Sequence, residues 1–142
     1  MLITCFRDLE AWRQGIELVE ECYKATRPFP SHEMYGLTSQ MRRAAVSIPS
    51  NVAEGHARKT TAVYANHVSI ALGSEAELET CIVVAQRLGY LSNDDASALV
   101  ARCHTVGKIL SGLFTSLERK MLAAQNSHVS RPIRYAKPKT EP

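Results

Sequence analysis

The chain has 142 residues, a length that suits one domain with a core of its own. Hydrophobic residues make up 45% and charged residues 22% of it, which are ordinary values for a globular protein. The net charge of +3 comes from the last residues, because residues 1–123 hold thirteen basic and thirteen acidic side chains. A neutral body argues against the strong basic surface that dominates non-specific nucleic-acid binding.

The four cysteines show no C-x-x-C pair. Cys22, Cys81 and Cys103 stand beside apolar residues in helical segments, which predicts buried thiols in a reducing compartment. The first ten residues lack the basic and apolar pattern of a signal peptide, and no window reaches the roughly 18 apolar residues of a membrane span. We therefore expect a cytoplasmic protein without a membrane role.

Apolar residues at spacings of three and four predict two amphipathic helices in the first half of the chain. The first begins at the N-cap Asp8 and ends before Pro28. Ser31 is the expected N-cap of the second, and Gly55 marks its expected end. Pro49 lies inside the second helix and removes one backbone hydrogen bond, which predicts a kink or a split into two shorter helices.

The second half of the chain predicts two more helices. Thr60 or Thr61 caps the third, which ends at Gly89. Ser92 caps the fourth, which is expected to fade near Ala124. Four long helices with short connections predict an all-α, antiparallel up-down-up-down four-helix bundle over residues 1–123.

Residues 124–142 are polar, basic and rich in proline, a composition that favours a flexible tail. Its single acidic residue, Glu141, is outnumbered by Arg131, Arg134, Lys137 and Lys139.

A hairpin between the second and third helices would pair residues whose numbers sum to about 118. This register places Ala44 and Ala45 opposite Ser74 and Gly73, so that small residues allow a close approach of the two backbones. It also places two arginines, Arg42 and Arg43, beside three acids, Glu75, Glu77 and Glu79.

Glu75 lies on the apolar stripe of its helix, so it needs a partner if it is buried, and Arg43 is the nearest candidate. We interpret these charges as structural; the alternative is a polar contact between subunits.

The sequence offers no recognisable catalytic apparatus. A di-iron site in a helical bundle needs Glu-x-x-His pairs, and none of the five histidines has a glutamate three positions before it. Glu75 and Glu79 lie one turn apart, but an ion-pair network explains them better than half of an acid pair. A phosphate-binding glycine loop, a G-x-S-x-G elbow and a cysteine near a base are also absent. We therefore predict a protein that is not an enzyme and needs no metal or cofactor.

Four blocks carry a family resemblance: residues 6–12 (FRDLEAW), 33–55 (EMYGLTSQMRRAAVSIPSNVAEG), 70–80 (IALGSEAELET) and 88–91 (LGYL). They resemble the four-helix-bundle family encoded in intervening sequences of bacterial large-subunit (23S) ribosomal RNA genes. The resemblance runs in order from Phe6 to about Leu117. It implies a bundle that assembles into a ring, as a homopentamer, with a relation in fold to accessory variability determinant proteins of retroelements. It implies no known activity.

The second block holds the polar positions Gln40, Ser47, Asn51 and Glu54. In a structural interpretation, Ser47, Ser50 and Asn51 satisfy backbone groups freed by the proline, and the helix ends at the glycine that follows. In the alternative, Asn51 and Glu54 join the adjacent basic residues in a polar rim where subunits or a ligand meet.

Two functions remain. We expect a non-enzymatic oligomeric binding module for RNA or a ribonucleoprotein, in which phosphates are contacted by the tail and by Arg42, Arg43, Arg58 and Lys59. The alternative is a structural or protein-protein interaction scaffold without a nucleic-acid role, in which the two neighbouring arginines pair with the acids of the third helix.

Overall fold

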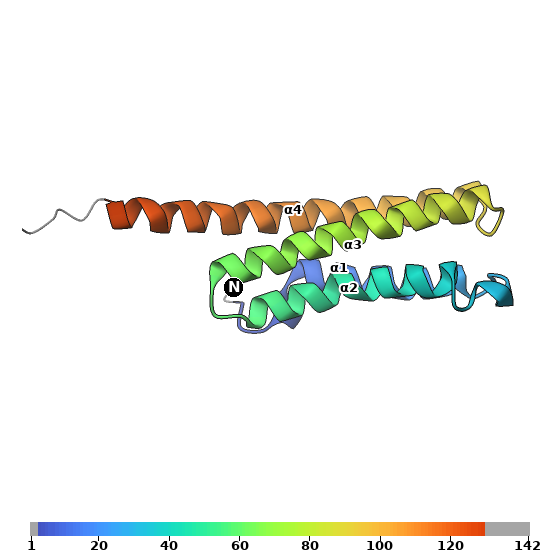
Figure 1. The fold of residues 1–142 in the computed structure, drawn as a ribbon, viewed down its shortest axis with the longest axis horizontal. Coiled ribbons are helices and arrows are strands. Elements are labelled where there is room, and N and C mark those ends of the chain that lie inside the picture. Colours follow the sequence, from blue (N-terminus) through green and yellow to red (C-terminus); the bar gives the residue numbers. More distant parts are fainter. Residues whose placement is uncertain (1–2, 130–142) are drawn as a thin grey trace, which may run out of the picture.

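The computed structural model describes residues 3–129. Four helices make up most of this part: α1 (Glu10–Thr26), α2 (Leu37–Ala57), α3 (Thr61–Arg87) and α4 (Asn93–Val129). Two short 3-10 turns, η1 (Phe6–Asp8) and η2 (Ser31–Glu33), precede α1 and α2, and the described residues include no strand. Each of α1 and α3 packs against both α2 and α4 (Figure 1). The all-α, up-down-up-down bundle predicted from the sequence is therefore confirmed.

The core runs along the bundle axis and is built from the apolar stripes of all four helices. Its large side chains are fully buried, and burial of each stabilises the fold by roughly 1.5 to 3 kcal/mol. They include Leu18, Met41, Ile48, Leu78, Ile82 and Leu110.

The N-terminal boundaries of the first two helices differ from the prediction. Asp8 does not cap α1: it lies in η1, where its carboxylate accepts a hydrogen bond from the amide of Cys5 at 3.2 Å. Ser31 opens η2 instead of capping α2. The carboxylate of Glu33 supplies the cap, because it accepts a bond from the amide of Leu37 at 2.8 Å.

The caps of the last two helices agree with the sequence. Thr60 is the N-cap of α3, and its hydroxyl accepts from the amide of Val63 at 3.3 Å. Ser92 accepts from the amide of Asp95 at 3.1 Å at the start of α4. Gly89 follows α3 with a φ of +78°, a left-handed conformation that glycine adopts without strain.

Pro49 does not split α2, which is one helix from Leu37 to Ala57. The proline ring packs on Gly15 of α1, where an added Cβ would lie 3.3 Å from the Cβ of Pro49. Gly55 does not end α2 either, because two further helical residues follow it.

The fourth helix does not fade at Ala124 but continues to Val129. Its last turns project past the end of the other three helices (Figure 1). Residues 124–129, which were predicted to belong to the flexible tail, are therefore helical, and the rest of the predicted tail, residues 130–142, lies outside the described part. Within the described residues, no helix is both long and apolar enough to cross a membrane.

Candidate functional site

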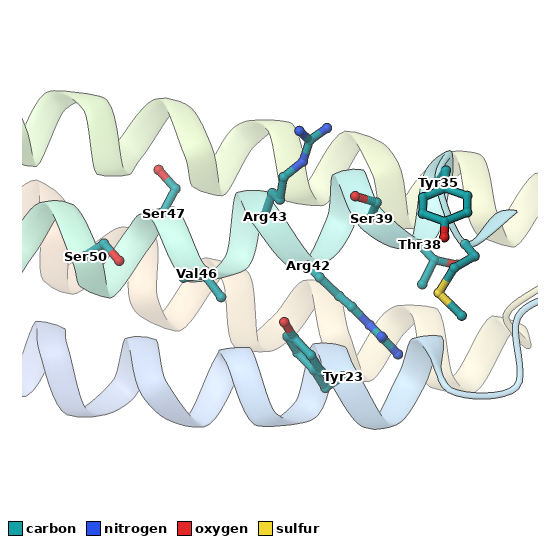
Figure 2. A pocket seen from close by; sticks show the side chains of 10 residues that line it. Tyr23, Tyr35, Thr38, Ser39, Arg42, Arg43, Val46, Ser47 and Ser50 are labelled. Atoms are coloured by element: carbon teal, nitrogen blue, oxygen red, sulfur yellow. The ribbon is translucent and has the colours of Figure 1, made fainter.

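A groove with a volume of about 630 Å³ lies along the exposed side of α2. Its lining contains two arginines and no carboxylate, together with hydroxyl, aromatic and apolar side chains (Figure 2). We call it the α2 groove, and it is lined by Tyr23, Met34, Tyr35, Thr38, Ser39, Arg42, Arg43, Val46, Ser47 and Ser50.

Arg42 is held in place by contacts with α1. Its Nε donates a 2.9 Å hydrogen bond to the hydroxyl of Thr26, which itself donates to the carbonyl of Cys22 at 2.8 Å. The guanidinium carbon lies 4.5 Å from the centre of the Tyr23 ring, a cation–π contact. The structure gives Arg42 no ion pair within residues 3–129. Its terminal nitrogens therefore remain available in the groove.

Arg43 is exposed and points away from Arg42, toward α3 (Figure 2). The expected ion pair between Arg43 and Glu75 does not form, and no described acid pairs with Arg43. The predicted pairing of Arg43 with Glu75 is therefore wrong.

Glu75 faces α4 instead of α2. An added Cβ at Gly107 of α4 would lie 3.3 Å from its Oε2 atom. Burial raises the pKa of Glu75, and Glu79 raises it further, while His104 acts in the opposite direction. The imidazole of His104 lies 3.1 Å from the carboxylate of Glu79. These acids belong to the α3–α4 interface, which explains why they do not meet Arg43.

The end of the groove near the α2 N-terminus combines the most exposed aromatic residue of residues 3–129 with a buried threonine. Tyr35 is 98% exposed, and Met34 beside it is 52% exposed. Thr38 lines the groove at only 4% exposure. Its hydroxyl has no hydrogen-bond partner within the part of the chain that the structure describes. None of these three residues was predicted from the sequence to be a site residue.

A polar network joins α2 to α3 beside the groove. The hydroxyls of Ser47 and Ser74 share a 2.8 Å hydrogen bond. The amide nitrogen of Asn51 donates to the carbonyl of Ser47 at 2.8 Å, and its Oδ1 lies 3.0 Å from Nδ1 of His67. Ser47 and Asn51 therefore hold the helices in register. The residue numbers of Asn51 and His67 sum to 118, which agrees with the predicted register of the two helices.

The close approach of α2 and α3 does not occur at Gly73. Open space surrounds the position of a Cβ there, whereas Ser74 is buried. The backbones come close at Gly55 instead, where a Cβ would lie 2.8 Å from both the Cβ of His67 and the Cδ2 of Tyr64.

The remaining residues selected from the sequence lie elsewhere. Arg58 and Lys59 are exposed in the turn before α3, and Arg58 is the C-cap of α2. Arg43 lies fifteen residues earlier in the chain, or about 22 Å along a helix. The four basic residues therefore form two separate sites. Gln40 is exposed, and the Glu54 carboxylate lies 3.7 Å from Nδ1 of His67.

The family model of the 23S rRNA-intervening sequence protein matches residues 7–112. The chain belongs to this family. None of the curated proteins compared with the chain matches it. A solved structure of similar fold is a protein with unknown function from the S23 ribosomal protein family of Bacteroides thetaiotaomicron VPI-5482. The TM-score is 0.69 at 17% identity, with 74% of this chain and 95% of that chain covered.

Membership of the 23S rRNA-intervening sequence protein family does not assign an activity to the chain. The similar solved structure, at 17% identity, supports the fold alone. The match includes all of α2 and therefore most of the α2 groove, whereas the projecting end of α4 lies beyond it.

The cysteines of this family member lie where the sequence placed them. Cys22, Cys81 and Cys103 are buried, and Cys5 is half-buried. Burial raises the pKa of Cys22 to about 11 and that of Cys103 to about 12, so these thiols stay protonated and unreactive. Across residues 3–129, no three His, Cys, Asp or Glu side chains are grouped so as to hold a metal ion.

Proposed function

We propose that the protein is a non-enzymatic, oligomeric binding module for RNA or a ribonucleoprotein. The observation that carries this proposal is the α2 groove, in which Arg42 and Arg43 have no acidic partner among residues 3–129 and no described carboxylate lines the surface. Other grooves on residues 3–129 place acidic side chains beside basic ones: Glu20 beside Lys24 and Arg27, Glu75 beside His104 and Lys108, and Glu21 and Asp95 beside Lys24 and Arg102.

Arginine suits phosphate because its planar guanidinium offers several donors in a fixed arrangement. Arg42 loses little side-chain entropy on binding, because Tyr23 and Thr26 already hold it. Arg58 and Lys59 add a second basic site at the other end of α2. A phosphate backbone that reached both sites would gain contacts at each.

Self-association of several chains would raise the affinity for RNA, because a single neutral bundle binds a polyanion weakly. Val63, Ile70 and Val84 are each about two-fifths exposed, and their spacings place them on one side of α3. Such a stripe favours contact with another subunit. Several copies in a ring, the homopentamer that the family resemblance implies, would present several basic sites to one polyanion.

The competing function is a structural or protein-protein interaction scaffold with no nucleic-acid role. Exposed Met34 and Tyr35 support it, since methionine and tyrosine are enriched in protein interfaces. The two arginines favour RNA, because no acid within the described part of the chain pairs with either of them and a scaffold gains little from such cations.

The test is a fluorescence-anisotropy titration of the full-length protein against a labelled hairpin RNA that has paired and single-stranded regions. We expect binding that weakens steeply as salt increases, because phosphate contacts release counterions. Changing the tail residues Arg131, Arg134, Lys137 and Lys139 to glutamine should remove part of that salt dependence. If the folded protein does not bind the RNA at low salt, the RNA proposal is wrong and the scaffold function is favoured.

A further inference from the structure

The α2 groove also indicates which form of RNA it fits, an inference that rests on the proposed function. Figure 2 shows Arg42 and Arg43 diverging from α2, one toward Tyr23 and the other toward α3. Because the two guanidinium groups point apart, they do not hold one phosphate together. They suit successive phosphates of a strand that crosses α2.

The second observation is the unpaired hydroxyl of Thr38. The side chain of Thr38 is 4% exposed and lines the groove, and its hydroxyl forms no hydrogen bond within residues 3–129. The hydroxyl is not one of the fully buried side-chain atoms that lack a partner, so its oxygen still reaches solvent. Its oxygen accepts from a ribose hydroxyl or donates to a phosphate oxygen. Such a group, one helical turn from Arg42, is placed to meet a polar ligand.

The third observation is Tyr35. Tyr35 lies at the end of the groove and is 98% exposed, so its ring is open to solvent. Exposed aromatic rings beside cationic grooves bind single-stranded nucleic acids, because unstacked bases pack on them. A duplex keeps its bases stacked inside and would leave Tyr35 without a role.

We propose that the α2 groove binds a single-stranded RNA segment. Arg42 and Arg43 contact successive phosphates, the Thr38 hydroxyl bonds the sugar-phosphate backbone, and one base stacks on Tyr35. A partner protein would need acidic side chains to match the two arginines; RNA provides a negative charge at every nucleotide.

The experiment compares two labelled RNAs of equal length, an unstructured oligouridylate and a duplex, binding to the full-length protein in anisotropy titrations. We expect tighter binding of the single strand. Tyr35→Ala should weaken that binding about tenfold, within the range for loss of one stacked base, and Tyr35→Phe should weaken it less. Thr38→Val, which keeps the side-chain shape, should also weaken binding.

Two variants are matched controls. Arg13→Gln removes an exposed arginine of α1, and Leu122→Ala shortens an exposed apolar side chain of α4; neither residue lines the groove. Both should bind the single strand as the wild type does. Circular dichroism of every variant confirms that the bundle is folded.

Three results would overturn the inference. Equal binding of both RNAs with no effect of Tyr35→Ala would leave a phosphate-binding module without a single-strand site, so the proposed function would survive. No binding of either RNA would remove both proposals. A changed molar mass of Tyr35→Ala in light scattering, with RNA binding unaffected, would assign the groove to a subunit contact.

Discussion

Asn51 on α2 and His67 on α3 are joined by a 3.0 Å contact between Oδ1 and Nδ1. The orientation of the Asn51 amide is fixed, because its nitrogen donates to the carbonyl of Ser47 at 2.8 Å. The oxygen therefore faces His67, so Nδ1 of the imidazole carries the hydrogen and donates. This pair connects the helix that carries the α2 groove to its neighbour.

Asn51→Ala should lower the free energy of unfolding by about 1 to 3 kcal/mol, because it removes the amide that bonds both Nδ1 of His67 and the carbonyl of Ser47. Urea unfolding followed by circular dichroism measures the change. Asn66→Ala, which removes an exposed amide from α3, is the control and should change stability little. Equal effects of the two substitutions would mean that the network contributes no stability.

Gly55→Ala and Gly73→Ala should have opposite effects on stability. A Cβ at Gly55 would lie 2.8 Å from atoms of Tyr64 and His67, so the helices must shift, at a cost of about 1 to 3 kcal/mol. Gly73 has open space, so alanine should stabilise α3 by roughly 0.5 to 1 kcal/mol. Thermal unfolding of both variants checks the direction of each stability change. A loss of stability in Gly73→Ala would indicate that α2 and α3 come close at Gly73 after all.

Glu75 should make stability fall as pH rises. Burial and Glu79 raise its pKa in the folded protein above the ordinary value of 4.5, although His104 partly offsets this. Between those two pKa values the folded protein keeps a proton that the unfolded chain has lost. The free energy of unfolding therefore decreases through this interval and stays lower above it.

Glu75→Gln should remove this cost, so we expect a higher melting temperature than the wild type at pH 7 and a smaller difference below pH 4.5. The charged groups facing Glu75 are Glu79 on its own helix and His104 and Lys108 on α4. Glu77→Gln, which changes an exposed acid on the same helix, is the control. A pH-independent difference for Glu75→Gln would contradict the mechanism.

Ile70→Glu should weaken self-association, because it places a charge in the exposed apolar stripe of α3. The molar mass in solution, measured by light scattering over a range of concentrations, should fall toward that of one chain. Ser69→Glu adds the same charge at an exposed position on another side of α3 and should leave the mass unchanged. An unchanged mass for Ile70→Glu would exclude this stripe as the contact.

The sequence predicted the four helices well because apolar periodicity and caps are local signals. Thr60 and Ser92 cap their helices as expected, since each needs only a backbone amide three residues away. The prediction that Ser31 caps the second helix was wrong because the carboxylate of Glu33 accepts from the first amide of α2. The fourth helix continues beyond its apolar stripe because residues 124–129 contain no proline or glycine that would end it.

The site was harder to predict because it depends on rotation about the helix axis. The contact between Asn51 and His67 fits the predicted register, whereas Ser74 bonds Ser47 and not the predicted Ala44. The register also could not show that Glu75 faces α4, so that no described acid pairs with Arg43. Tyr35 carried a usable signal: an aromatic residue in the polar turn just before α2, off the apolar stripe, predicts exposure.

The central claim is that the arginines of the α2 groove contact RNA phosphates. The most direct test is the salt dependence of oligouridylate binding by full-length Arg42→Gln/Arg43→Gln protein, compared with Arg13→Gln. Loss of two phosphate contacts on a single strand should reduce the slope of log K against log salt concentration by about 1.4, while Arg13→Gln keeps the wild-type slope. A double variant whose affinity and slope equal those of Arg13→Gln would contradict the account.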